Sequence, residues 1–169
     1  NPVVIYYLSS IVVMSLVIAC SLMAEGGYTS WGRALLDSTF NTVSYMTTTG
    51  FAICDNSTWP VLAGMVLMLA GIQCGCSGST TGGLKVDRVL IIFKSFANEL
   101  RHRLHPSSVS QVKMGGHYLP DNVVSSVFMY IVMYVVVIFI SIIAVMLCGS
   151  EPIEAVSGVI SSVGSVGPG

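Results

Sequence analysis

Two long segments without charged side chains dominate the pattern of apolar and polar residues. They cover residues 3–23 and 123–148. A helix rises about 1.5 Å per residue, so roughly 20 apolar residues suffice to cross the hydrocarbon core of a bilayer, which is about 30 Å thick. Both segments are therefore predicted to be transmembrane helices.

Two shorter segments, residues 32–46 and 153–163, are too short to cross a bilayer. The first carries Asp37 and Ser38 in its first half and places apolar residues at helical spacing. This pattern predicts a re-entrant half-helix, which enters the membrane and stops inside it. The partially negative C-terminal end of such a helix favours a nearby cation. A helix lying in the membrane interface is the alternative interpretation.

A short turn rich in small residues follows each half-helix. Residues 47–51 read Thr-Thr-Thr-Gly-Phe, and residues 164–169 read Gly-Ser-Val-Gly-Pro-Gly. In selectivity filters, backbone oxygens replace the hydration shell of an ion, and Gly allows the positive φ that turns carbonyls inward. An ordinary turn between two helices is the alternative for either match taken alone.

The chain contains this arrangement twice. When residues 37–51 are laid on residues 154–168 without gaps, Thr48-Thr49-Gly50 falls on Ser165-Val166-Gly167. Internal repetition sets the architecture of a protein. The sequence therefore predicts an all-α membrane protein built from repeats of helix, re-entrant pore half-helix and helix, with extended selectivity-filter segments.

The helical signal after the first turn is interrupted. Trp59-Pro60 precedes an apolar helix over residues 61–73, and helix is expected again over residues 84–96. The intervening residues 74–83 are rich in Gly, Ser and Thr. Irregular backbone at membrane depth survives only where it is buried in protein or lines a water-filled cavity. The loop is therefore predicted to cross or line a pore; an aqueous loop after a re-entrant helix is the alternative.

Composition and charge placement agree with a membrane protein. The chain is 53% hydrophobic and only 9% charged, where a soluble domain carries about 25%. Six of the seven Lys and Arg residues lie between Lys85 and Lys113. By the positive-inside rule, residues 98–121 form a cytoplasmic loop and both turns face the outer side. The chain starts without Met and ends within the second turn, so we interpret it as an internal fragment of a longer protein.

The chain lacks the residues that several other kinds of site require. Lys85 does not directly follow the second Gly of a phosphate-binding loop, as that motif requires. Cys74 and Cys76 have no further thiol or imidazole nearby in sequence to complete a metal site. The two long apolar segments contain no acidic, basic or His residue for proton relay or proteolysis. We expect neither enzymatic activity nor a nucleic-acid partner. The competing class is a membrane-embedded enzyme or a scaffold whose Gly-rich turns pack helices.

Three sites give the chain a resemblance to the Trk/Ktr/HKT potassium transporters, and within them to the TrkH-type membrane subunit. They are residues 47–51, residues 76–85 with Arg88 and His105-Pro106, and residues 164–169. The resemblance implies four repeats around one pore. Residues 1–97 would be the third repeat, residues 98–121 a cytoplasmic basic loop, and residues 122–169 a truncated fourth repeat.

The resemblance also implies the activity, which is potassium uptake across a bacterial inner membrane by a multi-pass protein. It implies a homodimer with a cytoplasmic nucleotide-binding regulatory subunit and no cofactor other than the transported ion. A Na⁺-permeable or Na⁺/K⁺-coupled transporter is the alternative, which filters outside this chain would decide. Thr81 and Cys74 stand where the family often has Gly, which would stiffen the loop.

Two groups of residues would carry this function. Filter residues are Thr48, Thr49, Gly50, Ser165, Val166 and Gly167, with K⁺ held at Thr48, Thr49, Ser165 and Val166. Gating-loop residues are Gly75, Gly78, Ser79, Thr80, Gly82, Gly83 and Lys85. The Lys85 side chain would add an electrostatic barrier to the ion path or serve as an anchor at the inner face.

Overall fold

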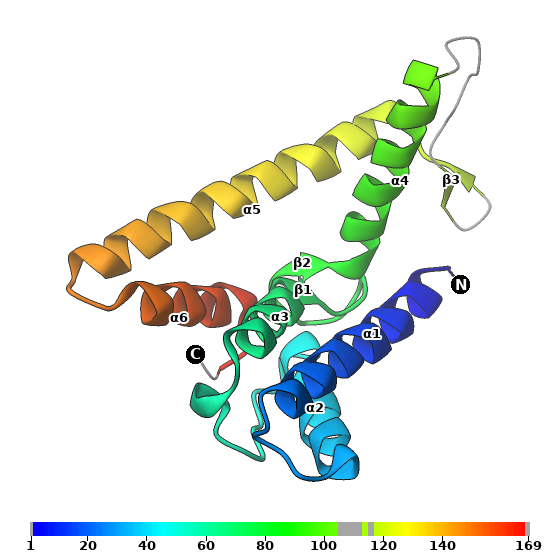
Figure 1. Cartoon of the computed structure of the whole chain (residues 1–169). Helices are drawn as coiled ribbons and strands as arrows, with labels where there is room; N and C mark the ends of the chain where they lie inside the picture. The colour runs from blue at the N-terminus through cyan, green and yellow to red at the C-terminus, as the bar shows by residue number, and fades with distance from the viewer. Residues whose placement is uncertain (1, 105–112, 115–116, 168–169) are drawn as a thin grey trace.

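The computed structural model describes residues 2–104, 113–114 and 117–167 and is almost entirely helical (Figure 1). The helices are α1 (Pro2–Ala24), α2 (Trp31–Met46), α3 (Val61–Ile72), α4 (Val86–Leu104), α5 (Asp121–Leu147) and α6 (Pro152–Gly164), with a 3-10 turn at Asn56–Thr58. Two pairs of two-residue strands complete the fold: β1 (Gln73–Cys74) with β2 (Leu84–Lys85), and β3 (Lys113–Met114) with β4 (His117–Tyr118).

The two predicted transmembrane helices are present as α1 and α5. Both are long and apolar enough to cross a membrane. Along α5, all of which the structure describes, only Tyr134 is buried against the rest of the chain. An apolar helix with an exposed surface is stable in lipid, because lipid tails are as apolar as the side chains that face them. These helices agree with the predicted all-α membrane class.

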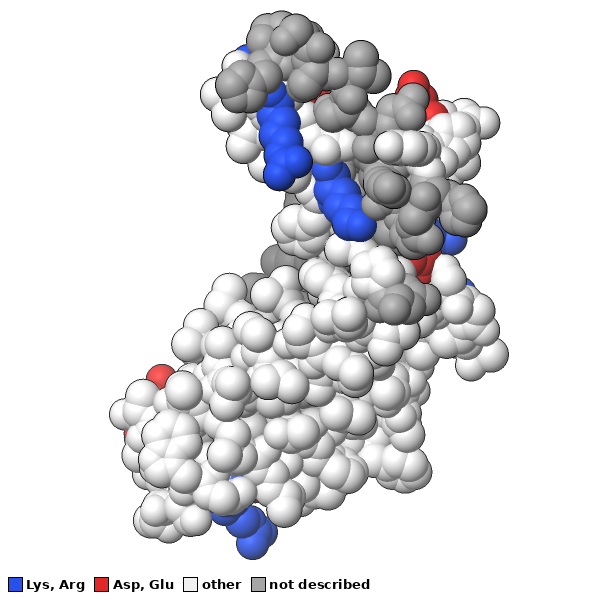
Figure 2. All heavy atoms as spheres, turned by 90° about the vertical axis from the view of Figure 1, so that its right-hand side faces the viewer, with Lys and Arg blue, Asp and Glu red and all other residues white. Residues whose placement is uncertain are grey.

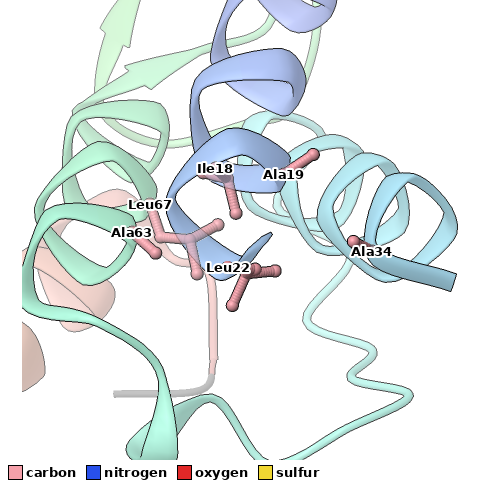
Figure 3. Close-up of a cluster of buried hydrophobic side chains, with 6 residues drawn as sticks. All are labelled: Ile18, Ala19, Leu22, Ala34, Ala63 and Leu67. Atoms are coloured by element: carbon pink, nitrogen blue, oxygen red, sulfur yellow. The ribbon is translucent and has the colours of Figure 1, made fainter. Parts of the chain in front are cut away.

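The packed core lies where α1, α2 and α3 meet (Figure 3). Small residues allow the three helices to approach closely, as is usual for helices packed in a membrane. The α1 residues of this core lie against Ala34 of α2 and against Ala63 and Leu67 of α3. The fully buried side chains of the cluster belong to Ile18, Ala19, Leu22, Ala34, Ala63 and Leu67. This bundle holds α2 in place, so the residues that follow α2 start from a fixed position.

Helix α6 packs against the same bundle, although it lies near the other end of the sequence. Figure 1 shows α5 running from beside α4 to the opposite side of the molecule, and α6 returning from there toward α3. A methyl group on Gly71 of α3 would lie 3.5 Å from the side chains of both Tyr45 in α2 and Ile160 in α6. Helix α3 is therefore packed between the C-terminal ends of α2 and α6.

The helix after the first turn is interrupted, as the sequence predicts. Helix α3 ends at Ile72, and β1 then pairs in parallel with β2, with Gln73 opposite Leu84 and Cys74 opposite Lys85. Parallel pairing means that the chain returns close to its point of departure and continues in the same direction. The end of α3 and the start of α4 therefore lie side by side, with the loop of residues 75–83 inserted between them.

The boundaries of the second helical piece differ from the prediction. We expected helix over residues 84–96 and a loop from residue 98, whereas α4 starts at Val86 and continues to Leu104. The added residues 97–104 contain no Gly or Pro and are mostly good helix formers. The Arg103 side chain also donates to Glu99 one turn earlier, at 3.2 Å. His102 consequently lies on a helix, while His105 and Pro106 lie outside the described residues.

Candidate ion-binding turns and the adjoining loop

The turns after α2 and α6 come together in space, although they are far apart in the sequence. A methyl group on Gly167 would lie 3.7 Å from the Cα atom of Gly50. Each turn directly continues the C-terminal end of its helix, and α3 lies between those two ends. The repeat seen in the sequence therefore corresponds to two turns that share one location.

The backbone follows the same course in both turns. Thr48 and Ser165 both adopt the left-handed conformation, with φ values of 54° and 57°. Gly50 and Gly167 follow two residues later, also with positive φ, at 76° and 111°. The left-handed region costs a residue with a side chain about 1–2 kcal/mol, so two such residues at equivalent positions require local compensation.

Equivalent hydrogen bonds supply this compensation. The Thr49 amide donates to the carbonyl oxygen of Ser44 at 3.0 Å, and the Val166 amide donates to that of Ser161 at 2.9 Å. Each bond spans five residues and closes the end of its helix, as left-handed C-terminal caps commonly do. The gapless alignment pairs these four residues in the same way. The two copies of the repeat therefore correspond even in individual hydrogen bonds.

The electrostatic setting of the turns favours a cation. The C-terminal end of a helix carries about half a negative charge, which arises from its unpaired carbonyl groups. Helices α2 and α6, both fully described, have no basic residue in their last turns to neutralise it. Within the first turn, the Thr47 and Thr49 hydroxyls hydrogen-bond each other at 2.6 Å. Two C-terminal helix ends whose partial negative charge is not neutralised by a basic residue of the same helix thus meet at one place.

A buried polar face of α2 fixes the segment that follows the first turn. The Asn41 amide donates to the Cys54 thiol at 3.3 Å, and the Asn56 amide donates to the Asn41 side-chain oxygen at 3.4 Å. The Tyr28 hydroxyl donates to the Asp37 carboxylate at 2.8 Å, and burial with this bond raises the pKa of Tyr28 to about 12. These contacts lie outside the predicted site; their signal in the sequence was the helical spacing of Asp37, Asn41 and Ser44.

The loop between β1 and β2 lies against the end of α6, next to the second turn. A methyl group on Gly82 would lie 2.6 Å from the Gly164 carbonyl oxygen, and one on Gly164 would lie 2.7 Å from the Gly71 carbonyl oxygen. These distances are too short for any real side chain. Backbones of α3, the loop and α6 therefore touch one another, and only Gly fits at these positions.

Hydrogen bonds within the loop hold it folded. The Lys85 ammonium group donates to the Ser79 carbonyl oxygen at 3.1 Å. The Ser79 hydroxyl lies 2.6 Å from the Thr81 hydroxyl, and the Val86 amide donates to the Gly75 carbonyl oxygen at 3.3 Å. Of the predicted gating residues, Lys85 lies in β2, which closes the base of the loop by pairing with β1. The others all lie in the loop itself: Gly75, Gly78, Ser79, Thr80, Gly82 and Gly83.

Comparisons with known proteins match nearly the whole chain. The TrkH family model, described as "Cation transport protein", matches residues 2–169. The Trk system potassium uptake protein TrkH of Salmonella typhimurium is 32% identical over 158 residues, which cover 92% of this chain and 33% of that protein. That of Halomonas elongata is 37% identical over 136 residues, which cover 80% of this chain and 28% of that protein.

A solved structure has the same fold. The crystal structure of the potassium transporter TrkH from Vibrio parahaemolyticus matches with a TM-score of 0.91 at 32% identity, over 100% of this chain and 36% of that chain. The chain thus spans about a third of the length of the relatives that it matches. The family consists of membrane transporters and not of enzymes. With a family match over residues 2–169, the chain belongs to the TrkH family of cation transport proteins.

Proposed function

We propose that this chain forms part of a pathway for potassium uptake across a bacterial inner membrane. The observation that carries the proposal is the meeting of two turns with the same backbone, Gly50 against Gly167, at the ends of α2 and α6. In this arrangement a K⁺ ion exchanges its hydration water for backbone carbonyl oxygens. The oxygens come from residues 48–50 and 165–167, and K⁺ sites form at Thr48, Thr49, Ser165 and Val166.

Two turns supply only part of a ring around an ion. The relatives are about three times as long as this chain, which leaves room for further repeats that complete the ring. We assign residues 1–97 to one repeat and residues 122–169 to most of the next, with residues 98–121 as the cytoplasmic connection. This topology places both turns toward the outer face, in line with the cluster of basic residues on the opposite side.

The loop between β1 and β2 acts as a gate in this proposal. It lies against the backbone at the end of α6, directly beside the second turn, and Lys85 holds its Ser79 carbonyl. In the folded position it obstructs the path below the turns, and ions pass when it moves aside. The family resemblance further supports a homodimer controlled by a cytoplasmic nucleotide-binding subunit.

The test uses the full-length protein in cells that lack their own K⁺ uptake and grow on limiting K⁺. Wild type is compared with Gly50→Ser, each with and without added Na⁺. We expect rescue by wild type and weaker K⁺/Na⁺ discrimination in the variant. Gly64→Ser is the matched control, because a side chain at that α3 position meets nothing within 4 Å in the described part of the chain.

Each other outcome has a defined meaning. Failure of a well-expressed wild type to rescue growth, with its regulatory subunit supplied, would contradict potassium uptake and favour a scaffold. Rescue by a Gly50→Ser variant with unchanged discrimination would remove the first turn from the ion path. Equal uptake of Na⁺ and K⁺ by wild type would favour the Na⁺-permeable alternative.

A further inference from the structure

The second half of α4 exposes a continuous apolar stripe. Phe93, Phe96, Leu100 and Leu104 are spaced three or four residues apart and therefore lie on one side of the helix. Their side chains are 60%, 69%, 53% and 69% exposed. Large apolar side chains exposed in a row mark a surface that meets either lipid or protein.

The opposite side of the same helix faces the protein with less apolar residues. Ile91 is buried there, and Ser95 and Asn98, which follow at helical spacing, are half-buried. A helix on a water-soluble protein shows the reverse arrangement, with its apolar stripe toward the core. The inside-out pattern of α4 fits an apolar environment around the helix.

Basic side chains border the apolar stripe on both sides. At 100° per residue, Lys94 and Arg101 fall on one border and Arg103 falls on the other. Figure 2 shows Lys and Arg side chains gathered at the end of the molecule where Figure 1 places α4. Long basic side chains beside an apolar stripe reach toward lipid headgroups while their stems stay in the apolar region.

The depth of Arg101 and Arg103 in the membrane, estimated from helix lengths, matches the lipid headgroup region. Helix α3 has 12 residues and is about 18 Å long, roughly half of the bilayer core or slightly more. The loop after it consequently lies near the middle of the membrane. From Val86, where α4 starts, Arg101 is about 22 Å further along the helix, which is beyond the hydrocarbon and at the level of the phosphates.

We propose that residues 93–104 of α4 form a binding site for an anionic phospholipid. Acyl chains cover Phe93 and Phe96, while Arg101 and Arg103 bind the headgroup phosphate. Charge complementarity favours this occupant, because three basic residues and one acidic residue lie in the segment. Arg suits the role, since its planar guanidinium group can donate two hydrogen bonds to one phosphate. Arg88 is not part of the site, because it lies over the Tyr130 ring at 3.8 Å.

This proposal requires the membrane placement of the family and the side assigned to α4, but no particular ion selectivity. A failure of the Gly50→Ser test would therefore leave it intact. The other possible occupants of the stripe are the remaining repeats of the full-length protein, a second copy of the protein and a regulatory protein. All three would cover the apolar residues with protein in place of lipid.

The first test measures retained lipid. The full-length protein is placed in nanodiscs of phosphatidylcholine mixed with phosphatidylglycerol, and bound lipids are counted by native mass spectrometry. The double variant Arg101→Gln/Arg103→Gln should hold phosphatidylglycerol less tightly than wild type, by about fivefold for each Arg, with phosphatidylcholine unchanged. Arg33→Gln is the matched control, because Arg33 is 76% exposed against 77% for Arg103 but lies at the start of α2.

The second test reports what touches the stripe. Tryptophan fluorescence of Phe96→Trp, with wild type as the baseline, is measured in nanodiscs that contain brominated phosphatidylglycerol. Strong quenching of the added signal is expected. An unquenched signal means that protein covers the stripe and overturns the proposal, as does unchanged phosphatidylglycerol retention in a double variant that elutes as a folded protein and supports K⁺ uptake.

Discussion

Gly50 and Gly167 lie against each other, so that a methyl group on Gly167 would be 3.7 Å from the Gly50 Cα atom. This distance leaves room for a methyl group, but the backbone of Gly167 does not suit one, since its φ is 111°. Conformation rather than space therefore selects Gly at this position. The same position in the first turn has a φ of 76°.

Gly167→Ala tests the second turn. A side chain at that φ strains the backbone by about 1–3 kcal/mol, so the turn should adopt another conformation and lose K⁺/Na⁺ discrimination. Ion fluxes of the purified full-length protein in proteoliposomes provide the measurement. Gly158→Ala is the control, because this α6 residue has open space around it and a helical backbone. Unchanged discrimination in Gly167→Ala would exclude the second turn from the ion path.

Gly82→Ala tests the contact between the loop and α6. Its methyl group would overlap the Gly164 carbonyl oxygen, at 2.6 Å, and should displace the loop. We expect a loss of about 1–3 kcal/mol in unfolding free energy and a larger K⁺ flux without the regulatory subunit. Gly78→Ala is the control for backbone strain in the same loop. Gly78 has a φ of 90°, so an Ala there strains the backbone, but its methyl group would have no atom within 4 Å to overlap. A gate in the loop is contradicted if Gly82→Ala leaves flux at the wild-type level.

Lys85→Met removes the side chain that binds the Ser79 carbonyl. A hydrogen bond from a charged donor contributes about 1.5–3 kcal/mol, so its loss should raise the open fraction of the loop by about tenfold or more. The readout is K⁺ flux in proteoliposomes. Lys85→Arg keeps a charged donor and should behave more like wild type. If both variants conduct like wild type, Lys85 neither holds the gate nor forms an electrostatic barrier.

Tyr28→Phe tests the buried polar face of α2. The variant leaves the Asp37 carboxylate, which is only 4% exposed, without the Tyr28 hydroxyl. We expect a loss of about 1–3 kcal/mol in stability and no change in ion discrimination. Thermal unfolding in detergent measures the first quantity, and proteoliposome flux measures the second.

The same pair predicts a pH dependence. The Tyr28 pKa is raised from 10.0 to about 12 in the folded protein, so the neutral hydroxyl stabilises the fold. The stability difference between wild type and Tyr28→Phe should be constant below about pH 10 and should decrease as the pH rises toward 12. A difference that grows with pH over this range would contradict the hydrogen bond to Asp37.

Local patterns made the ends of α2 and α6 predictable. Helix α2 ends at Met46, where three Thr residues and a Gly begin, and α6 ends at Gly164, directly before the second turn. The gapless alignment also anticipated matched turns, because equal spacing from the helix end leads to the same left-handed residue, Thr48 or Ser165. The roles of these residues in binding ions remain a prediction.

Other features of the fold could not be predicted from the pattern of residues in the sequence. The predicted end of α4 was wrong because residues 98–104, most of them polar, were interpreted as part of a loop, although they are mostly good helix formers without Gly or Pro. Two-residue strands such as β1 and β2 are too short to show an alternation of apolar and polar residues. The contact between Gly82 and Gly164 joins distant parts of the chain through backbone atoms, and Gly has no side chain that could indicate its partner.

That contact also has a consequence for biosynthesis. The ribosome synthesises α3, the loop and α4 before α6, so the Gly164 backbone that meets Gly82 does not yet exist when the loop leaves the ribosome. During this interval the loop lacks its backbone contact with α6, while its internal hydrogen bonds and its β1–β2 base can already form. Packing of the loop is therefore completed only when α6 arrives. We expect a chain truncated before α6 to leave the translocon with a loop that is not fixed in position. Membrane quality control should recognise such a chain.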